Sequence, residues 1–438
     1  MHKLYISEFV HKIPSFDNFY FLYDTRNFNL FKINEDESNL YDKILKDGVI
    51  FNEANSFIVD LLENNLLTKK NEDVLLEKNI KINEFKNMNN SEFNINYARI
   101  KLTNICNLAC KYCFVDKGEN YLSKTELNSI LDILIDKNKN DTLIIQYFGG
   151  EPMLKMELIK YCHNYLLKAY NLNKIKGFRE EIVTNGFFLD EENIHYLNDA
   201  QIDVTISIDG LKEINDLKRI TKDGKGTFDT VKKKINLYKE ITGKAPILIT
   251  LQEHNVYDFA NNTKKLIDEL GVTSIGINMP QPCKKGWEIS GKHMFNSIVS
   301  IYDFCLERDI KFTHGGNNIP YAMKFKKRNF GSCSNCIVLD RACKCGVMVD
   351  HNLEISTCII DKNINSTFDL LDFGKNSSSE LKKWFINNNY EDKCFKCIAY
   401  NICTGMCSME KEYSNINLDR CYFYKNMVLW TIERLSKT

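Results

Sequence analysis

The sequence predicts an α/β protein whose central part is a parallel sheet in a partial barrel, followed by a cysteine-rich unit. Over about 200 residues, short apolar runs alternate with segments whose apolar residues recur at helical spacing. Polar motifs follow several of these runs, and parallel α/β folds place their chemistry at the carboxyl ends of strands. The 16 cysteines gather mainly in two places, at 106–113 and 333–421.

Residues 1–90 contain no cysteine and form the first predicted unit. Two short strands, NFYFLYD and NFNLFKI, precede helical segments around ESNLYDKILKDG and NEANSFIVDLLENNL. This order predicts a small α+β module with winged-helix character. The polar run KNMNNSEFN at 86–94 is typical of a linker.

Residues 98–310 form the predicted barrel. Its strands are expected in ARIKLTNI, TLIIQYFG, EEIVTNG, DVTISIDG, PILITL and TSIGINMP. Its helices are expected in SKTELNSILDILIDK, ELIKYCHNYLLKAY, TFDTVKKKINLYKEI and VYDFANNTKKLIDEL. Residues 331–425 are dense in cysteine and poor in periodicity, so metal ligation is the expected source of their stability. Residues 421–438 are expected to form a closing helix.

Composition limits the classes of function. The chain has 438 residues and a formal net charge of zero, which gives no support for nucleic acid as the main partner. We expect no membrane partner, since no apolar run approaches the roughly 18–20 residues of a membrane span. The first residues lack the apolar core of a signal peptide, so a cytoplasmic location is expected. Thiols in a reducing compartment are more often metal ligands or catalysts than disulfides. Cys162, Cys283 and Cys305 stand apart from the two groups and are expected to be buried apolar residues.

Cys106, Cys110 and Cys113 follow the first predicted barrel strand at C-x3-C-x2-C spacing. Three thiolates on one loop can hold a 4Fe–4S cube and leave one of its four irons open. An open metal position suits a catalytic site, whereas structural sites are closed.

The motif resembles the CxxxCxxC signature of the radical S-adenosylmethionine (SAM) superfamily, which follows the first strand of a partial (β/α)6 barrel. The resemblance covers roughly residues 98–310. It implies that Cys106, Cys110 and Cys113 are catalytic and hold a 4Fe–4S cluster whose open iron binds SAM.

Further motifs in the same order resemble the SAM contacts of that superfamily. The resemblance implies that FGGEP holds the methionine amino group, that TNG and SIDG face the ribose and methionine, and that an arginine pairs with the carboxylate. An aromatic residue and a leucine are expected against the adenine. The predicted cofactor-binding residues are Tyr112, Gly149, Gly150, Glu151, Thr184, Asn185, Ser207, Arg219 and Leu251. Many relatives carry His-Asp before the arginine, where this chain has Asn215 and Asp216.

The second cysteine group resembles the seven-cysteine SPASM extension, which binds two auxiliary 4Fe–4S clusters. The resemblance assigns one cluster to Cys394, Cys397, Cys403 and Cys421. It assigns the other to Cys345, Cys358 and Cys407, with an open site or a fourth ligand from upstream, where Cys333, Cys336 and Cys343 lie. The family usually has a glycine five residues before its second cysteine, where this chain has Leu353. A zinc site is the alternative that the cysteines alone leave open.

Together these resemblances imply a radical SAM/SPASM peptide maturase with three 4Fe–4S clusters. Such an enzyme would cleave SAM reductively and install a thioether or carbon–carbon crosslink in a ribosomally made precursor peptide. The expected partners are that peptide, whose leader sequence the N-terminal module would bind, and an electron donor such as flavodoxin or ferredoxin. The alternatives are formylglycine formation, as in anaerobic sulfatase maturases, and a non-enzymatic electron carrier with several clusters.

Overall fold

The computed structural model describes residues 3–15, 18–50, 54–70, 72–74, 76, 94–138, 142–278, 289–313, 318–326, 344–350, 353–356, 367–369, 392–403 and 418–437. The predicted linker at 86–94 lies outside these residues except for Asn94. Within the described part of the chain, no helix is both long and apolar enough to cross a membrane.

The N-terminal module is a small α+β unit, as predicted. Its three-stranded antiparallel sheet has the order β2-β3-β4, and β1 pairs antiparallel with β5. The elements are β1 (Tyr5–Ile6), β2 (Val10–Pro14), β3 (Tyr20–Asp24), β4 (Asn29–Ile33), α1 (Glu35–Asp47), α2 (Ser56–Glu63) and β5 (Leu67–Thr68). A capping box between Asn34 and Glu37 starts α1, because each side chain accepts a hydrogen bond from the other residue's backbone.

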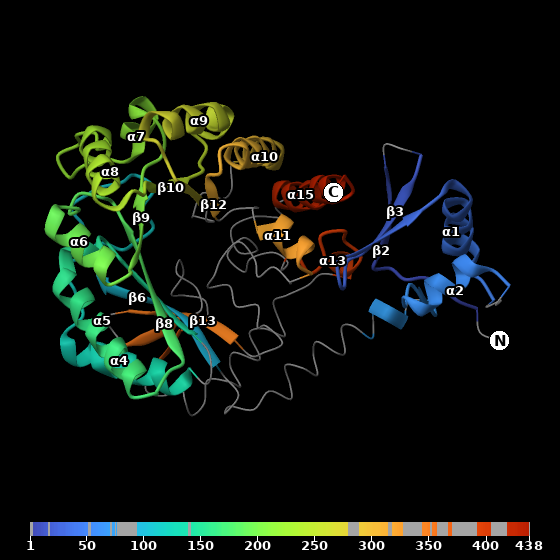
Figure 1. Ribbon diagram of the computed structural model, residues 1–438, viewed down its shortest axis with the longest axis horizontal. Helices are drawn as coiled ribbons and strands as arrows, with labels where there is room; N and C mark the ends of the chain where they lie inside the picture. Colours follow the sequence, from blue (N-terminus) through green and yellow to red (C-terminus); the bar gives the residue numbers. More distant parts are fainter. Residues whose placement is uncertain are drawn as a thin grey trace.

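The predicted barrel strands are confirmed as neighbours in one parallel sheet. The strands are β6 (Asn94–Thr103), β7 (Thr142–Gly149), β8 (Gly177–Thr184), β9 (Asp203–Ser207), β10 (Pro246–Thr250) and β11 (Ser274–Asn278). They lie side by side in chain order. Figure 1 shows helices covering the outer side of this curved sheet. All their carboxyl ends therefore lie at one edge, where the polar motifs follow them.

The helices of this sheet include three that the apolar pattern did not single out, α6, α7 and α10. The helices are α4 (Lys124–Lys137), α5 (Met156–Asn171), α6 (Glu191–Asp199), α7 (Lys212–Lys218), α8 (Phe228–Thr242), α9 (Phe259–Leu270) and α10 (Gly291–Glu307). Ser123 and Glu126 form the capping box of α4, and left-handed glycines end α8 and α9 at Gly243 and Gly271. The buried faces of these helices and the strands share one apolar core.

The sheet extends beyond the predicted barrel at both edges. On one edge β12 (Lys311–Thr313) pairs parallel with β11. On the other, β13 (Lys344–Val349) pairs parallel with β6, and β14 (Glu354–Ser356) and β15 (Thr367–Asp369) follow antiparallel. The cysteine-rich segment therefore supplies strands to the sheet, which its weak periodicity did not indicate.

Three helices complete the described part of the C-terminal region: α11 (Asn318–Lys324), α13 (Asp392–Phe395) and α15 (Leu418–Leu435). The predicted closing helix is confirmed as α15, which packs against α10 through an Arg434–Asp303 ion pair of 2.7 Å. Figure 1 shows α13 and α15 between the barrel and the N-terminal module.

A buried polar group lies between α5, β7 and β8. Glu180 is 2% exposed and accepts a hydrogen bond from Tyr147, and its other carboxylate oxygen lies 2.6 Å from Nδ1 of His163. The hydrogen bond to Glu180 raises the pKa of His163 above its usual value near 6.5. A buried acid among apolar residues needs such partners, because an unpaired charge there is costly.

This pair predicts a pH-dependent contribution to stability. A raised folded-state pKa means that the contribution is fully present below pH 6.5 and is lost as the pH rises through the folded pKa. A charge-assisted hydrogen bond contributes about 1.5–3 kcal/mol. The difference in melting temperature between the natural chain and His163→Gln is therefore expected to shrink between pH 6 and pH 9. A constant difference over that range would contradict the ion pair.

Candidate functional site

The first cysteine group lies on the loop that follows β6, and we name residues 104–113 the cysteine loop. Cys106 is buried, Cys110 is half-buried and Cys113 is exposed. The loop runs beside residues 218–221, because Ala109 N donates to Ile220 O at 2.8 Å and Lys111 N donates to Lys218 O at 2.9 Å. Backbone hydrogen bonds to a second segment therefore fix the loop independently of its thiols.

Each thiol of this loop interacts electrostatically with the next one along the chain. Burial raises the pKa values of Cys106 and Cys110, and each is raised further by the next thiol along the loop. Lys117 near Cys106 and Arg219 near Cys110 act in the opposite direction. A bound cation-rich cluster would favour the thiolate forms, since metal ligation requires deprotonated cysteine.

The two glycines of FGGEP pack against this loop. A Cβ atom at Gly149 would lie 2.2 Å from the Thr103 carbonyl oxygen, and one at Gly150 would lie 2.2 Å from that of Ile105. Gly150 N also donates to Thr103 O at 2.8 Å. The glycines therefore let the end of β7 approach the backbone that leads into Cys106.

Adding one methyl group at Gly150 is expected to displace the cysteine loop. A contact of 2.2 Å to backbone cannot be relieved by a side-chain rotation, so Gly150→Ala should cost about 1–3 kcal/mol or more. The matched control is Gly177→Ala, whose Cβ would meet only Thr142 Oγ1 at 3.7 Å. We expect Gly150→Ala to retain about four fewer Fe per chain after anaerobic reconstitution. Equal iron in both variants would contradict this role of the glycine.

Glu151 joins the ends of β7 and β8. Its Oε1 accepts hydrogen bonds from Thr184 Oγ1 at 2.7 Å and Met153 N at 3.1 Å, and its Oε2 accepts one from Asn185 N at 2.7 Å. The side chain is 1% exposed, and burial raises its pKa while the three donors partly offset that effect. The Asn185 amide in turn donates to Asn107 Oδ1 at 2.7 Å in the cysteine loop.

Arg219 and Tyr112 meet at the end of β9. Arg219 Nη1 donates to Tyr112 Oη at 2.7 Å, and the Tyr112 hydroxyl donates to Asp209 Oδ2 at 2.5 Å. Asp209 Oδ1 accepts from Thr250 N at 3.0 Å, so the same carboxylate also fixes the end of β10. Burial is the largest cause of the raised pKa of Tyr112. Buried Nε of Arg219 has no hydrogen-bond partner, which leaves a donor available to an anionic ligand.

The remaining predicted residues of this edge lie nearby in the sheet. Ser207 ends β9 and is paired with Leu248 of β10. Leu251 follows β10 and is fully buried. Asn215 is also fully buried. Its Oδ1 accepts a hydrogen bond from Asp209 N, and its Nδ2 donates to Asp216 Oδ1 and Thr227 Oγ1. Asn215 of α7 therefore joins the segment that follows β9 to the start of α8.

The structure brings most of the first predicted site together and adds residues to it. The cysteine loop, FGGEP, TNG and Arg219 converge at the carboxyl edge of β6–β9. Sequence reasoning did not single out Asn107 or Lys117, and it quoted Asp209 only as part of SIDG. A signal for Asp209 existed, because a carboxylate that follows a buried strand in this fold faces the same edge.

Part of the second cysteine group is described. Cys394 and Cys397 lie in or just after α13, Cys403 ends the following turn, and Cys421 lies in α15. Cys397 lies close enough to Cys421 to raise the pKa of that thiol, although burial contributes more. Cys345 lies in β13, paired with Ile95 of β6. The predicted residues that lie outside the described part of the chain are Cys333, Cys336, Cys343, Cys358 and Cys407, with Cys283 elsewhere.

Leu353 takes the conformation that a glycine would take at this turn. Its φ is 57°, in the left-handed region that L-residues rarely adopt, and its N–H donates to Asp350 O at 3.1 Å. The turn between β13 and β14 is thus made without the glycine, at a cost of roughly 1–2 kcal/mol.

The two cysteine groups differ in the number of thiols that they offer to a metal centre. Among the described residues, no three His, Cys, Asp or Glu side chains lie close enough together to hold one metal ion. In a cubane each thiolate binds a different iron, so its cysteines stand further apart than the ligands of one zinc. The first loop carries three thiols, and the described residues of the second group between 394 and 421 carry four, Cys394, Cys397, Cys403 and Cys421, the number that a closed cube would require.

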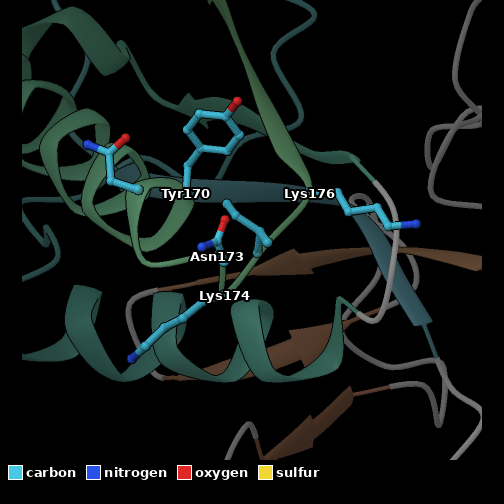
Figure 2. A pocket seen from close by; sticks show the side chains of 6 residues that line it. Tyr170, Asn173, Lys174 and Lys176 are labelled. Atoms are coloured by element: carbon cyan, nitrogen blue, oxygen red, sulfur yellow. The ribbon is translucent and has the colours of Figure 1, made fainter.

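One surface pocket lies away from the cysteine loop, at residues 170–176. A shallow depression of about 930 Å³, much of it open to solvent, lies at the turn between α5 and β8. Figure 2 shows Lys174 and Lys176 there pointing away from each other. It lies at the amino end of β8, opposite the cysteine loop, so it is no part of the site.

A comparison with protein families includes the residues of this loop. Residues 100–261 match the radical SAM superfamily. This chain is a radical SAM enzyme. The matched range contains the three cysteines of the loop, Glu151 and Arg219, so the residues that converge at the strand ends all lie within it. Membership of the superfamily implies a 4Fe–4S cluster and SAM as cofactors.

Two relatives of this radical SAM enzyme align with most of the chain. The radical SAM cyclopropyl synthase TigE of Paramaledivibacter caminithermalis is 23% identical over 99% of this chain and 96% of its own. The cysteine-type anaerobic sulfatase-maturating enzyme of Clostridium perfringens is 25% identical over 75% of this chain and 94% of its own.

Solved structures share the fold. The structure titled native anSMEcpe with bound AdoMet and Cp18Cys peptide has a TM-score of 0.64 at 20% identity, covering 78% of this chain and 98% of its own. Streptococcus suis SuiB bound to precursor peptide SuiA has a TM-score of 0.54 at 17% identity, covering 94% of this chain and 97% of its own. At such low sequence identities, these TM-scores establish a common fold and nothing further.

Proposed function

We propose that this radical SAM enzyme is a SPASM-type peptide maturase that installs a thioether or carbon–carbon crosslink in a ribosomally made precursor peptide. The observation that carries the proposal is the combination of the cysteine loop with two further structures, the N-terminal module and the second cysteine group. SAM cleavage requires only the cysteine loop. The other two suit a macromolecular substrate that must be held while one of its side chains reacts.

The chain's own residues take distinct roles in this proposal. Cys106, Cys110 and Cys113 hold a 4Fe–4S cluster, which when bound and reduced supplies the electron for cleavage of SAM. Glu151 and Arg219 orient SAM through its amino and carboxylate groups, since each places a charge of the required sign at the edge of the sheet. Cys394, Cys397, Cys403 and Cys421 hold one auxiliary cluster, and Cys345, Cys358 and Cys407 hold another.

The N-terminal module would bind the leader of the precursor. An extended peptide can add to an exposed sheet edge through main-chain hydrogen bonds. Among the described residues β4 pairs with β3 alone, so its other edge is available for such a strand. The similarity to TigE and SuiB extends over nearly the whole chain, whereas that to the sulfatase maturases covers about three quarters. This difference supports a precursor peptide as the substrate over a sulfatase, and therefore argues against formylglycine formation.

The product of the reaction distinguishes the two candidate functions. We expect the enzyme, incubated anaerobically with SAM, a reductant and the peptide of a short cysteine-rich reading frame beside its gene, to yield a product about 2 Da lighter. Crosslinking preserves all heavy atoms and joins two residues, which tandem mass spectrometry detects as a missing fragment series. Formylglycine at a cysteine would instead remove the sulfur. SAM cleavage with no change in any leader-bearing peptide would contradict both.

A further inference from the structure

The turn that carries three of the proposed auxiliary-cluster ligands also contacts the N-terminal module. We name residues 392–403 the cysteine turn. Its cysteines, at positions 394, 397 and 403, alternate with residues that face the module, and Figure 1 shows α13 of this turn beside β2. Two features that the sequence places more than 300 residues apart are therefore adjacent in the fold.

An apolar cluster joins the N-terminal module to the cysteine turn. Phe9 and Val74 of the module and Phe395 and Tyr400 of the cysteine turn form a small buried core of their own. The Tyr400 ring lies 5.2 Å from that of Phe9 and 5.5 Å from that of Phe395, measured between centroids. Aromatic pairs at such distances contribute beyond their buried area.

Polar contacts fix the orientation of the N-terminal module relative to the cysteine turn. Asn401 is 6% exposed, and its Nδ2 donates to the carbonyl oxygens of Thr25 at 3.2 Å and Arg26 at 3.3 Å. Lys396 forms an ion pair with Glu8. Asn401 has a φ of 64°, in the left-handed region that asparagine adopts more readily than most residues.

The other side of the cysteine turn meets α15. Cys421 lies near the start of that helix, close to Cys397, and α15 is held on the barrel by Arg434–Asp303 and by Trp430 against Tyr302 at 5.2 Å. Module residues also reach the core that contains Phe423 and Tyr424 of α15. The cysteine turn therefore lies between the N-terminal module and α15, which is itself fixed to the barrel.

We propose that the cysteine turn is the docking surface of the N-terminal module, and that metal ligation of its thiols and docking of the module stabilise each other. The inference rests on the proposed ligand set. Ligation by Cys394, Cys397, Cys403 and Cys421 would tie the turn to α15 and so fix Phe395, Tyr400 and Asn401 in the positions that the module contacts. Because the coupling is reciprocal, docking of the module must raise the affinity of the turn for that cluster by the same factor.

The first arm of the test changes the docking surface and measures iron. In the reconstituted full-length enzyme, Asn401→Gly removes the amide contacts but keeps a residue that tolerates φ of 64°, and it is combined with Tyr400→Ala. The matched control is Asn173→Gly, another left-handed asparagine, at the α5–β8 turn. We expect about four Fe to be lost to a chelator at least threefold faster in the double variant, with the control unchanged. Equal rates would overturn the inference.

The second arm changes a ligand and measures docking. In Cys397→Ser we expect faster amide hydrogen exchange at residues 7–10 and 24–28, with exchange in α1 unchanged because the module itself stays folded. Cys305→Ala, a buried thiol of α10, is the control. If Cys397→Ser loses about four Fe and exchange does not change, docking is independent of ligation and the inference fails while the ligand set stands. If its iron equals that of the natural chain, the ligand set fails, and the inference with it.

Discussion

Replacing Cys106, Cys110 and Cys113 together by alanine is expected to abolish SAM cleavage while leaving the chain folded. The three thiols are the only ligands that the loop offers to its cluster, and the open iron of that cluster is where SAM would bind. The loop backbone is held by its hydrogen bonds to residues 218–221, which do not involve the thiols. Anaerobic incubation with dithionite and SAM, followed by chromatography for 5′-deoxyadenosine, measures the loss.

Iron content measured on the same variant tests the number of clusters. Three cubanes correspond to about 12 Fe per chain, so the triple variant should retain about eight. Cys162→Ala is the matched control, since this thiol is fully buried in α5, away from the loop. Four or fewer Fe in the natural enzyme would contradict the two auxiliary clusters. Formation of 5′-deoxyadenosine by the triple variant would contradict the role of the loop.

The sequence predicted the barrel well because its strands are local apolar runs between amphipathic helices. All six runs between residues 98 and 280 form neighbouring parallel strands. β12 has three residues, too few for a pattern, and β13 depends on pairing with β6, about 250 residues earlier in the chain. Periodicity reports which face of a segment is buried, but it does not report which distant strand lies beside it.

The candidate site was predicted residue by residue where motifs carry their own chemistry. The cysteine loop, Glu151 and Arg219 do converge, but the contacts between them could not be predicted. FGGEP indicated glycines that let a ligand approach, whereas in this structure they let the cysteine loop approach. Asn401 carries no motif, and its importance arises from contacts with Thr25 and Arg26, which only the folded chain brings near.

Glu151→Gln is expected to weaken SAM binding by tenfold or more and to lower the melting temperature. Both carboxylate oxygens of Glu151 accept hydrogen bonds, so an amide group in either orientation turns a donor toward Asn185 N or toward Thr184 and Met153. Leaving a buried donor unpaired costs about 1–3 kcal/mol of folding stability. The loss of SAM affinity comes from removing the carboxylate charge that would pair with the ammonium group, and about 1.4 kcal/mol corresponds to tenfold in affinity.

The control is Glu157→Gln, whose exposed carboxylate lies 3.7 Å from Lys155 on the surface of α5. Two measurements separate the roles of Glu151. Thermal unfolding without SAM reports its hydrogen bonds to the ends of β7 and β8, and calorimetric titration with SAM reports contact with the methionine amino group. If the melting temperature falls while SAM affinity equals that of the control, Glu151 only positions the strand ends. A loss of affinity that persists in a variant stabilised elsewhere would assign the carboxylate to SAM itself, because the charge that pairs with the ammonium has then been removed while the strand ends remain in place.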